Sequence, residues 1–277
     1  MSPRLDQELA VRGLVTSRTR AAREIEAGRV RVDGRVVTKP ATKIAADAVL
    51  TLDEVDPWVA RSAHKLLGAL DSFGSVDPSG RVCLDAGAST GGFTQVLLER
   101  GAAEVFSVDV GHDQLSPVVV ADPRVHDMPG RNLRDLEPAW LGERGSVDLV
   151  VADLSFISLT LVLDRLLAVT RPGGELLLMV KPQFELGRSA LDKHGVVTDP
   201  RARARAVAGI AEAVAAAGAR VVDWAPSVLP GPTGNREYFL RITVPGTGTV
   251  PTGSAPPGTV DPELLADIVD RIGGERA

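Results

Sequence analysis

The sequence predicts an α/β protein in which a small α+β unit precedes a larger unit with a mostly parallel, helix-covered sheet. The chain has 277 residues, of which 44% are hydrophobic, so it can bury a real core at a length where one domain usually becomes two. Basic residues gather near its N-terminal end. Beyond residue 58, short apolar runs alternate with helical stretches, which is typical of a parallel sheet with covering helices.

Charge is unevenly distributed along the chain. Lys and Arg number 31 and Asp and Glu number 36, and the net charge of −5 argues against a general polyanion binder. Residues 1–46 nevertheless hold ten basic and five acidic residues, a local charge of +5, so the rest of the chain carries −10. This asymmetry predicts a basic region that contacts nucleic acid and a larger region with a different task.

Two further observations exclude classes of protein. A single cysteine, Cys83, cannot form an internal disulfide framework, and the N-terminal residues lack the apolar core of a signal peptide. The longest aliphatic stretch, Leu176 to Val180, is five residues long, where a membrane span needs about 20. We therefore expect a cytoplasmic protein that neither crosses a membrane nor binds a partner through a disulfide.

The N-terminal part of the chain predicts two short helices followed by a hairpin. Apolar residues recur with helical spacing over 4–13 and 17–27, where Ser17 is a suitable N-cap and Gly28 a suitable C-terminal stop. Valine then alternates with arginine up to an Asp-Gly dipeptide at 33–34, which favours a tight hairpin turn. Further apolar residues complete this small unit: Ile44, Val49, Leu50 and Leu52.

This N-terminal stretch resembles the alpha-L RNA-binding motif of a small-subunit ribosomal protein, pseudouridine synthases and tyrosyl-tRNA synthetases. The resemblance is carried by Arg4-Leu5-Asp6, Gly13-Leu14, Ser17-Arg18, Ala22, Ile25, the run from Gly28 to Gly34, and Lys39-Pro40. A merely solvated helix face would explain the arginines but not the turn, the caps and the spacing together. The resemblance implies RNA binding through six basic side chains: Arg4, Arg18, Arg20, Arg23, Lys39 and Lys43.

The larger region shows the alternation on which the fold prediction depends. Apolar runs predict strands at 82–86, 105–108, 147–152, 176–180 and 238–244. Helical spacing predicts helices at 91–100, 158–170 and 199–217. Pro, Gly, Thr and Ser dominate after the last strand to about residue 260, so we expect a flexible tail over 245–277 with one short amphipathic helix near 261–272.

A glycine-rich turn follows the first predicted strand, where the next helix begins. Such a turn lets a ligand approach the backbone closely. A nicotinamide-type fingerprint would need glycine at the position of Ser89, and a phosphate-binding P-loop would need a Gly-Lys-Ser/Thr sequence that is absent. The carboxylate of Asp85 at the strand end instead favours S-adenosylmethionine (SAM), because the sulfonium and amino groups of SAM are cationic.

Asp109 closes the second predicted strand, where a carboxylate can accept hydrogen bonds from both ribose hydroxyls of SAM. It lies 22 residues beyond Gly87, a spacing that dinucleotide-binding folds share, so the missing second glycine decides between the two cofactors. The residues expected to bind SAM lie in the turn and at the two strand ends: Asp85, Gly87, Ser89, Thr90, Gly91, Gly92, Phe93 and Asp109.

Two lysines and two carboxylates form a set that is dispersed in the sequence. Asp153 and Lys181 follow neighbouring predicted strands, and open α/β sheets place ligands and chemistry at such carboxyl ends. Lys65 precedes the first predicted strand of the larger region, and Glu237 directly precedes the last one, at 238–244. Lysine is rare here, with five among 31 basic residues, so lysines at these positions predict a chemical role.

Residues 4–244 resemble the TlyA (haemolysin A) family of ribosomal RNA 2′-O-methyltransferases, whose large domain is of FtsJ type. The family's Lys-Asp-Lys-Glu tetrad corresponds to four residues of this chain: Lys65, Asp153, Lys181 and Glu237. The segment 194–200 also matches the family. The interdomain tetrapeptide, which starts with arginine in some relatives, reads Asp-Pro-Trp-Val at 56–59 here.

The resemblance implies a Rossmann-like, SAM-dependent methyltransferase domain with a mostly parallel seven-stranded sheet over 64–244, after an RNA-binding domain over 1–55 and a linker over 56–63. Its substrate would be ribose 2′-hydroxyls of ribosomal RNA or ribosomal subunits, at cytidines of 16S rRNA, 23S rRNA or both. This transfer needs in-line geometry and a group that takes the proton of a weakly acidic hydroxyl. Lys181 can orient that hydroxyl and accept its proton, while the carboxylates of the tetrad position the two lysines.

Other functions fit the sequence less well. A base methyltransferase would show Asn/Asp-Pro-Pro-aromatic after the strand predicted at 147–152 or a nucleophilic cysteine, whereas residues 153–156 read Asp-Leu-Ser-Phe and Cys83 lies inside a strand. The four histidines lack a close ligand spacing, so no metal site is expected. The alternative is an RNA-binding scaffold or a haemolysin-like protein without methyl transfer, although the cofactor glycines and the tetrad are present and no lytic segment occurs.

Overall fold

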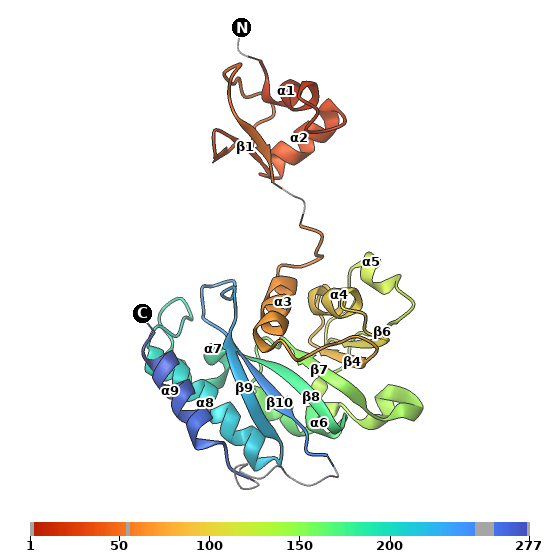
Figure 1. Cartoon of the computed structure of the whole chain (residues 1–277), viewed down its shortest axis with the longest axis vertical. Coiled ribbons are helices and arrows are strands. Elements are labelled where there is room, and N and C mark those ends of the chain that lie inside the picture. The colour runs from red at the N-terminus through yellow and green to blue at the C-terminus, as the bar shows by residue number, and fades with distance from the viewer. Residues whose placement is uncertain (1–2, 54–55, 247–257, 276–277) are drawn as a thin grey trace. The chain divides into compact units, whose positions relative to one another are not determined.

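The structure of the chain is a computed structural model. It describes three stretches, residues 3–53, 56–246 and 258–275. The chain folds into two compact units, Met1–Pro57 and Trp58–Ala277, and each unit has apolar cores of its own. In Figure 1 the first unit is coloured red to orange and the second runs from orange to blue.

The segment 56–63, which the sequence predicts as a linker, lies mostly in the second unit. The division falls between Pro57 and Trp58. Trp58 and Val59 pack against buried apolar side chains of the second unit, and helix α3 (Ser62–Phe73) begins before the segment ends.

The first unit packs two helices against an antiparallel sheet with the strand order β2-β1-β3. Its elements are α1 (Leu5–Val11), α2 (Arg18–Glu26), β1 (Val30–Val32), β2 (Arg35–Val36) and β3 (Leu50–Leu52). Apolar side chains from helices, strands and loops form its core: Leu5, Leu9, Ala21, Ile25, Val30, Ile44 and Ala48.

Local signals in the sequence account for these elements. The Ser17 side chain caps α2 by accepting a hydrogen bond from the backbone N–H of Arg20 at 3.2 Å. Gly28 follows the helix with a φ of +71°, and Asp33 and Gly34 form the hairpin turn with φ values of +50° and +77°. The predicted cap, stop and turn are therefore confirmed.

The second unit is built on a seven-stranded sheet with the order β6-β5-β4-β7-β8-β10-β9. Its strands are β4 (Val82–Ala86), β5 (Glu104–Val108), β6 (Val125–Met128), β7 (Val147–Ala152), β8 (Thr170–Val180), β9 (Arg220–Pro226) and β10 (Tyr238–Thr243). The pairings from β6 across to β8 are parallel, whereas β10 runs antiparallel to both β8 and β9. The expected mostly parallel, seven-stranded sheet is confirmed.

Helices cover both faces of this sheet (Figure 1). Side chains of α3 and α4 (Gly92–Glu99) pack in one core, and those of α6 (Leu163–Ala168), α8 (Pro200–Ala216) and α9 (Pro262–Gly273) pack in the other. The shorter turns are α5 (Pro117–Val120), α7 (Pro182–Glu185), η1 (Leu133–Asp135), η2 (Pro138–Arg144), η3 (Leu159–Leu161) and η4 (Arg188–Ala190). Within the three described stretches, every helix is too short or too polar to span a bilayer.

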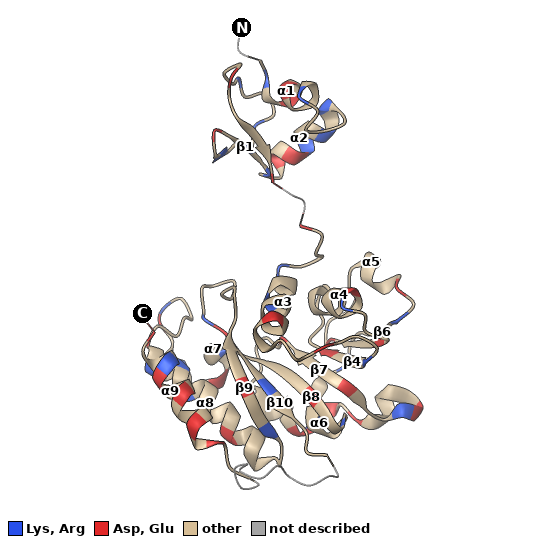
Figure 2. Ribbon diagram, in the orientation of Figure 1, with Lys and Arg blue, Asp and Glu red and all other residues tan. Residues whose placement is uncertain are grey.

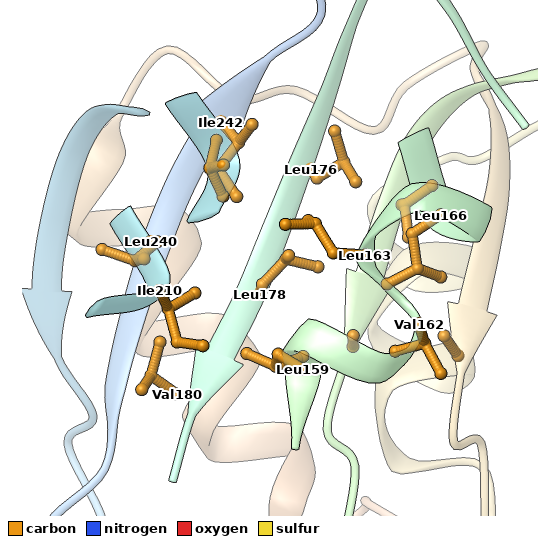
Figure 3. Close-up of a cluster of buried hydrophobic side chains, with 14 of the residues drawn as sticks. Leu159, Val162, Leu163, Leu166, Leu176, Leu178, Val180, Ile210, Leu240 and Ile242 are labelled. Carbon is orange, nitrogen blue, oxygen red and sulfur yellow. The ribbon is translucent and has the colours of Figure 1, made fainter. Parts of the chain in front are cut away.

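The end of strand β8 is buried on both faces. Leu176, Leu178 and Val180 lie in the core that α6 and α8 cover (Figure 3). Leu177 and Met179 point to the opposite face and lie in the core that α3 and α4 cover. Burial on both faces requires a continuous apolar run, which is the pattern from which this strand is predicted.

The C-terminal part of the chain corrects one prediction. A helix forms where the sequence predicts one, but α9 is not part of a flexible tail, because its Ile268 and Ile272 are fully buried in the core beside α8. The expected flexible tail over 245–277 is therefore wrong for α9. Residues 247–257, where the rest of that prediction falls, lie outside the described residues.

Glu275, just beyond α9, ties this helix to the sheet. Its carboxylate forms ion pairs at 3.1 Å with Arg203 of α8 and with Arg236. The same carboxylate accepts a hydrogen bond from the Tyr238 hydroxyl at 2.9 Å. The last described residue of the chain thus contacts the beginning of β10.

Candidate active site

The loop that joins β4 to α4 adopts a backbone that favours glycine. Gly87 and Gly91 have φ values of +85° and +93°, in the left-handed region. A Cβ on Gly87 would lie 2.8 Å from Leu154 Cδ2, and a Cβ on Gly92 would clash with Ser62 Oγ. The loop is therefore pressed closely against the segment after β7 and the beginning of α3, which requires glycine at these positions.

Asp109, at the end of β5, binds this loop through its carboxylate. Asp109 Oδ2 accepts a hydrogen bond from the Ser89 N–H at 2.8 Å, and Oδ1 accepts one from the Gly111 N–H at 2.8 Å. Ser89 has a φ of +47°, which is uncommon for a residue other than glycine. The structure thus brings two predicted cofactor residues, Ser89 and Asp109, into direct contact.

Asp85 lies beneath the loop and is fully buried. Its Oδ2 accepts a hydrogen bond from the Thr94 hydroxyl at 2.7 Å, and Thr94 also lies 2.8 Å from the Ser107 hydroxyl. Burial raises the pKa of Asp85 to about 7. Its Oδ1 has no hydrogen-bond partner among the described residues. Asp85 therefore supports the loop from below, and the role predicted for it at the cofactor stays a prediction.

Two cavities open beside the loop. The larger has a volume of about 560 Å³, and its lining includes Asp109, Gln114, Leu154 and Phe156. The smaller has a volume of about 200 Å³, and its lining includes Arg61, Ser62, Thr90 and Phe93. Four residues line both cavities and form the wall between them: Gly87, Ser89, Asp153 and Ser155. A ligand on the loop would therefore face residues from β7 and α3.

The tetrad predicted from the sequence forms two ion pairs at one edge of the sheet. In the first pair, Lys181 Nζ lies 2.6 Å from Asp153 Oδ1 and donates a hydrogen bond to Ser155 Oγ at 2.9 Å. Asp153 and Lys181 directly follow the parallel strands β7 and β8, so both stand at carboxyl ends of the sheet. The Lys181 side chain is largely buried.

The second pair joins α3 to the beginning of β10. Lys65 Nζ lies 2.5 Å from Glu237 Oε2 and 3.9 Å from Met179 Sδ. Both charged side chains are almost completely buried. Strand β10 is antiparallel to β8, and Tyr238 lies opposite Val180. Glu237, which precedes β10, therefore lies at the same end of the strands as Lys181, which follows β8.

The Asn235 side chain holds the segment 194–200 in place. This segment resembles the TlyA family, but the sequence predicts no role for it. Asn235 Oδ1 accepts a hydrogen bond from the Val197 N–H at 3.0 Å, and its Nδ2 donates to the Gly195 carbonyl at 2.9 Å. The Asn235 side chain is buried. This segment is therefore held beside the residues that lead into Glu237.

Phe156 is a candidate site residue that the sequence reasoning missed. Its side chain is 91% exposed although it lines the larger cavity, and its φ is +65°. A bulky aromatic residue rarely adopts this backbone conformation. The available signal was an aromatic residue three positions after Asp153, but a positive φ cannot be recognised from the sequence.

Part of the basic charge of the first unit is bound by its own carboxylates. Arg4 and Arg18 both bind the buried Asp6, and the hydrogen bond from Arg4 lowers the pKa of Asp6 to about 2. Arg20 and Arg29 bind the buried Glu24.

Three of the six predicted RNA-binding residues remain available for other anions. Within the described part of the chain, Arg23, Lys39 and Lys43 form no ion pair, and all three are exposed. Figure 2 shows the blue basic segments of α2 beside the red acidic ones. Of the six, Arg4, Arg18 and Arg20 are therefore partly neutralised, and Arg23, Lys39 and Lys43 are not.

Comparisons with known proteins agree with this arrangement. The sequence-family model of the FtsJ-like methyltransferases matches residues 58–243, and the sequence-family model of the S4 domain matches residues 3–50. The 16S/23S rRNA (cytidine-2′-O)-methyltransferase TlyA of Mycobacterium tuberculosis is 50% identical over 241 residues, which cover 86% of this chain and 89% of the relative. Hemolysin A of Brachyspira hyodysenteriae is 32% identical over 241 residues, which cover 87% of this chain and 100% of the relative.

A solved structure gives the same result. A protein of Streptococcus thermophilus, described as a hemolysin, is 32% identical with a TM-score of 0.68, and the match covers 97% of this chain and 96% of that chain. The FtsJ-like match spans more than half of the chain. With a relative that is 50% identical over 89% of its own length, the chain belongs to the TlyA family of FtsJ-like methyltransferases.

Proposed function

We propose that this protein transfers a methyl group from SAM to ribose 2′-hydroxyls of ribosomal RNA, at cytidines of 16S rRNA, 23S rRNA or both. The family membership supports this reaction, and the name of the Mycobacterium tuberculosis relative supports these targets. The S4 domain match supports RNA binding by the first unit. A ribosomal RNA substrate implies that the protein acts in the cytoplasm.

The observation that carries the proposal is the position of Lys181. Its two partners, Asp153 and Ser155, line the wall that the two cavities share, directly beside Gly87 of the loop. A methyl donor on the loop and a hydroxyl that approaches this wall would meet beside Lys181. Lys181 is therefore placed where the reacting hydroxyl must be oriented.

The cavity beside the loop fits SAM by its size and by its polar groups. A volume of about 560 Å³ lies in the usual range for a small-molecule site. We assign Asp109 to the ribose hydroxyls and the backbone around Gly87, Ser89 and Thr90 to the rest of the molecule. When bound, SAM supplies the methyl group on a cationic sulfonium.

The residues around Lys181 divide the chemical work. We assign Lys181 Nζ the role of orienting the 2′-hydroxyl and accepting its proton, and Asp153 the role of holding the ammonium that results. Ser155 Oγ accepts a hydrogen bond from Nζ and fixes its direction. Lys65 and Glu237 neutralise each other in the interior and hold α3 against the beginning of β10. We assign them a positioning role.

RNA contacts are assigned to two places, one in each unit. In the first unit, Arg23, Lys39 and Lys43 are available for phosphates, which supply most of the affinity of such contacts. In the second unit, the exposed ring of Phe156 at the mouth of the larger cavity offers a surface on which an unstacked base can lie.

We further propose that no disulfide links the protein to a partner. Cys83 is buried in β4, and burial raises the pKa of its thiol to about 12. A thiol that is buried and protonated does not attack a disulfide.

The experiment that tests the proposal is a map of 2′-O-methyl groups in ribosomal RNA from cells with and without this protein, repeated in vitro with purified protein, SAM and ribosomal subunits. Methyl groups that depend on the protein at defined cytidines would support it. RNA binding without any methyl transfer would identify an RNA-binding scaffold instead and contradict the proposal.

A further inference from the structure

Glu185 closes a cap on the segment that follows β7. It stands at the end of α7, four residues after Lys181. Its carboxylate accepts a hydrogen bond from the Leu159 N–H at 2.9 Å and another from the Ser158 hydroxyl. Ser158 is the N-cap of the turn η3, so Glu185 binds both the first N–H of the turn and its capping side chain.

The segment from Asp153 to Leu159 is thereby held at both ends by one short piece of chain. Lys181 binds Asp153 and Ser155 at the beginning of the segment. Glu185 binds its end. Between these contacts, the ring centroids of Phe156 and Phe184 lie 5.3 Å apart. Residues 181–185 thus contact the segment at three successive places.

Phe156, at the middle of this segment, needs such support. Its φ of +65° is unfavourable for a bulky side chain, and its ring is 91% exposed, so burial does little to offset the strain. A strained conformation of this kind persists only where the surrounding contacts fix it. The contacts on either side of Phe156 are those made by Lys181 and Glu185.

We propose that Glu185 is a positioning residue that holds the Phe156 ring at the mouth of the larger cavity, in the orientation that receives a nucleotide of the RNA substrate. This inference rests on the proposed function. Without the carboxylate, the Leu159 N–H and the Ser158 hydroxyl lose their partner, the end of the segment is released, and Phe156 relaxes to a negative φ. The nucleotide then meets an aromatic ring in several orientations instead of one.

The first measurement compares Glu185→Ala, Glu185→Gln, Phe156→Ala and the double variant Glu185→Ala/Phe156→Ala in methyl transfer to ribosomal RNA. We expect Glu185→Ala to lower kcat/KM for RNA by about tenfold or more, with a smaller effect on SAM affinity, because Asp109 and the loop backbone assigned to SAM keep their contacts. Glu185→Gln retains an acceptor oxygen for Leu159 and should restore most of the activity. Glu212→Ala, at an exposed position of α8, is the matched control.

The double variant tests whether Glu185 acts through Phe156. If it does, removing Glu185 costs nothing more once the ring is gone, and the double variant matches Phe156→Ala within about twofold. Additive losses would overturn the proposal, and so would a Glu185→Ala enzyme with wild-type kcat/KM. If Glu185→Ala does not fold, Ser158→Ala in the same comparison removes one of the two contacts and decides the question in the same way.

Hydrogen exchange provides a readout that is independent of activity. The Leu159 amide should exchange faster in Glu185→Ala than in Glu185→Gln, because only the alanine variant leaves this N–H without an acceptor. Faster exchange with unchanged RNA kinetics would contradict the positioning role while leaving the proposed function intact. Absence of RNA methylation by the wild-type protein would instead refute the proposed function and, with it, this inference.

Discussion

Lys65 Nζ lies 2.5 Å from Glu237 Oε2, and this ion pair is almost completely buried between α3 and the beginning of β10. The two residues are far apart in the sequence and enter the site from different elements. A charge in such a place depends on its partner, since removal of one member leaves the other charged, buried and without compensation.

Loss of either partner should therefore destabilise the fold. We expect Glu237→Ala to lower the free energy of unfolding by about 3–5 kcal/mol, as measured by urea denaturation. The double variant Lys65→Met/Glu237→Leu should be more stable than Glu237→Ala, because no unpaired charge remains. Arg100→Ala, which breaks the exposed pair with Asp71, should change stability by about 1 kcal/mol or less. Equal effects of Glu237→Ala and Arg100→Ala would contradict this account.

Lys181→Arg should slow methyl transfer strongly while leaving binding intact. A guanidinium stays charged and cannot accept the hydroxyl proton, whereas a lysine amine can. General-base catalysis contributes about 10²–10⁴-fold to the rate. The single-turnover rate at saturating SAM and RNA should therefore decrease by a factor of about 10²–10⁴. Lys193→Arg, at an exposed position, should be nearly silent. Near-full activity of Lys181→Arg would mean that lysine acts only as a charge.

Asp109→Ala should weaken SAM binding. The carboxylate holds the Ser89 N–H and is the group assigned to the ribose hydroxyls, so its loss removes charge-assisted hydrogen bonds and should lower SAM affinity by about tenfold or more in calorimetry. Asp164→Ala, at an exposed position of α6, is the control. The cofactor assignment fails if both Asp85→Ala and Asp109→Ala bind SAM as the wild type does.

The basic first unit should contribute RNA affinity in a salt-dependent manner. We expect the triple variant Arg23→Ala/Lys39→Ala/Lys43→Ala to bind ribosomal RNA more weakly and to keep its SAM affinity. Log affinity decreases with log salt concentration, and the magnitude of this slope should become smaller by about 0.7–0.9 for each phosphate that the variant no longer neutralises. Arg165→Ala, an exposed arginine of the second unit, should leave the slope unchanged. An unaltered slope in the triple variant would remove these residues from the RNA interface.

The buried Asp85 should make stability depend on pH. Burial raises its pKa from 3.8 to about 7, so the folded protein binds a proton that the unfolded chain releases near pH 4. The contribution of this carboxyl to stability therefore falls as pH rises from about 4 to about 7, and it stays low above that range.

Asp85→Asn cannot titrate and serves as the reference for this effect. The stability of the wild type relative to Asp85→Asn should decrease by up to roughly 4 kcal/mol between pH 4 and pH 8, at 1.36 kcal/mol per unit of pKa shift. Urea denaturation of both proteins at several pH values measures this difference. A difference that stays constant with pH would show that Asp85 does not titrate as its burial requires.

Features that depend on a few neighbouring residues could be predicted well from the sequence. Ser17 caps α2 and Gly28 ends it because each acts on the backbone within a few positions. The strand ending at Val180 was predictable because burial on both faces demands an unbroken apolar run. The edge strands β6 and β9 were not predicted, since their residues are only partly apolar and gain their structure from tertiary packing. Helix α3 was missed although its buried Ala63, Leu66, Leu70 and Phe73 recur with helical spacing.

The composition of the candidate site was predictable, whereas its pairing was not. A resemblance to a family identified Lys65, Asp153, Lys181 and Glu237, but which lysine contacts which carboxylate depends on the strand order and on the antiparallel β10. Phe156 escaped notice because its importance lies in a backbone angle and in its exposure. Neither property can be seen in the sequence.

The docking of α9 also sets an order of events during synthesis. The core of the first unit has all its residues once Leu52 has been added, whereas the core beside α8 lacks Ile268 and Ile272 until α9 leaves the ribosome. Domains fold as units, with N-terminal ones first. A nascent chain therefore completes its basic unit long before the unit that carries Lys65 and Lys181.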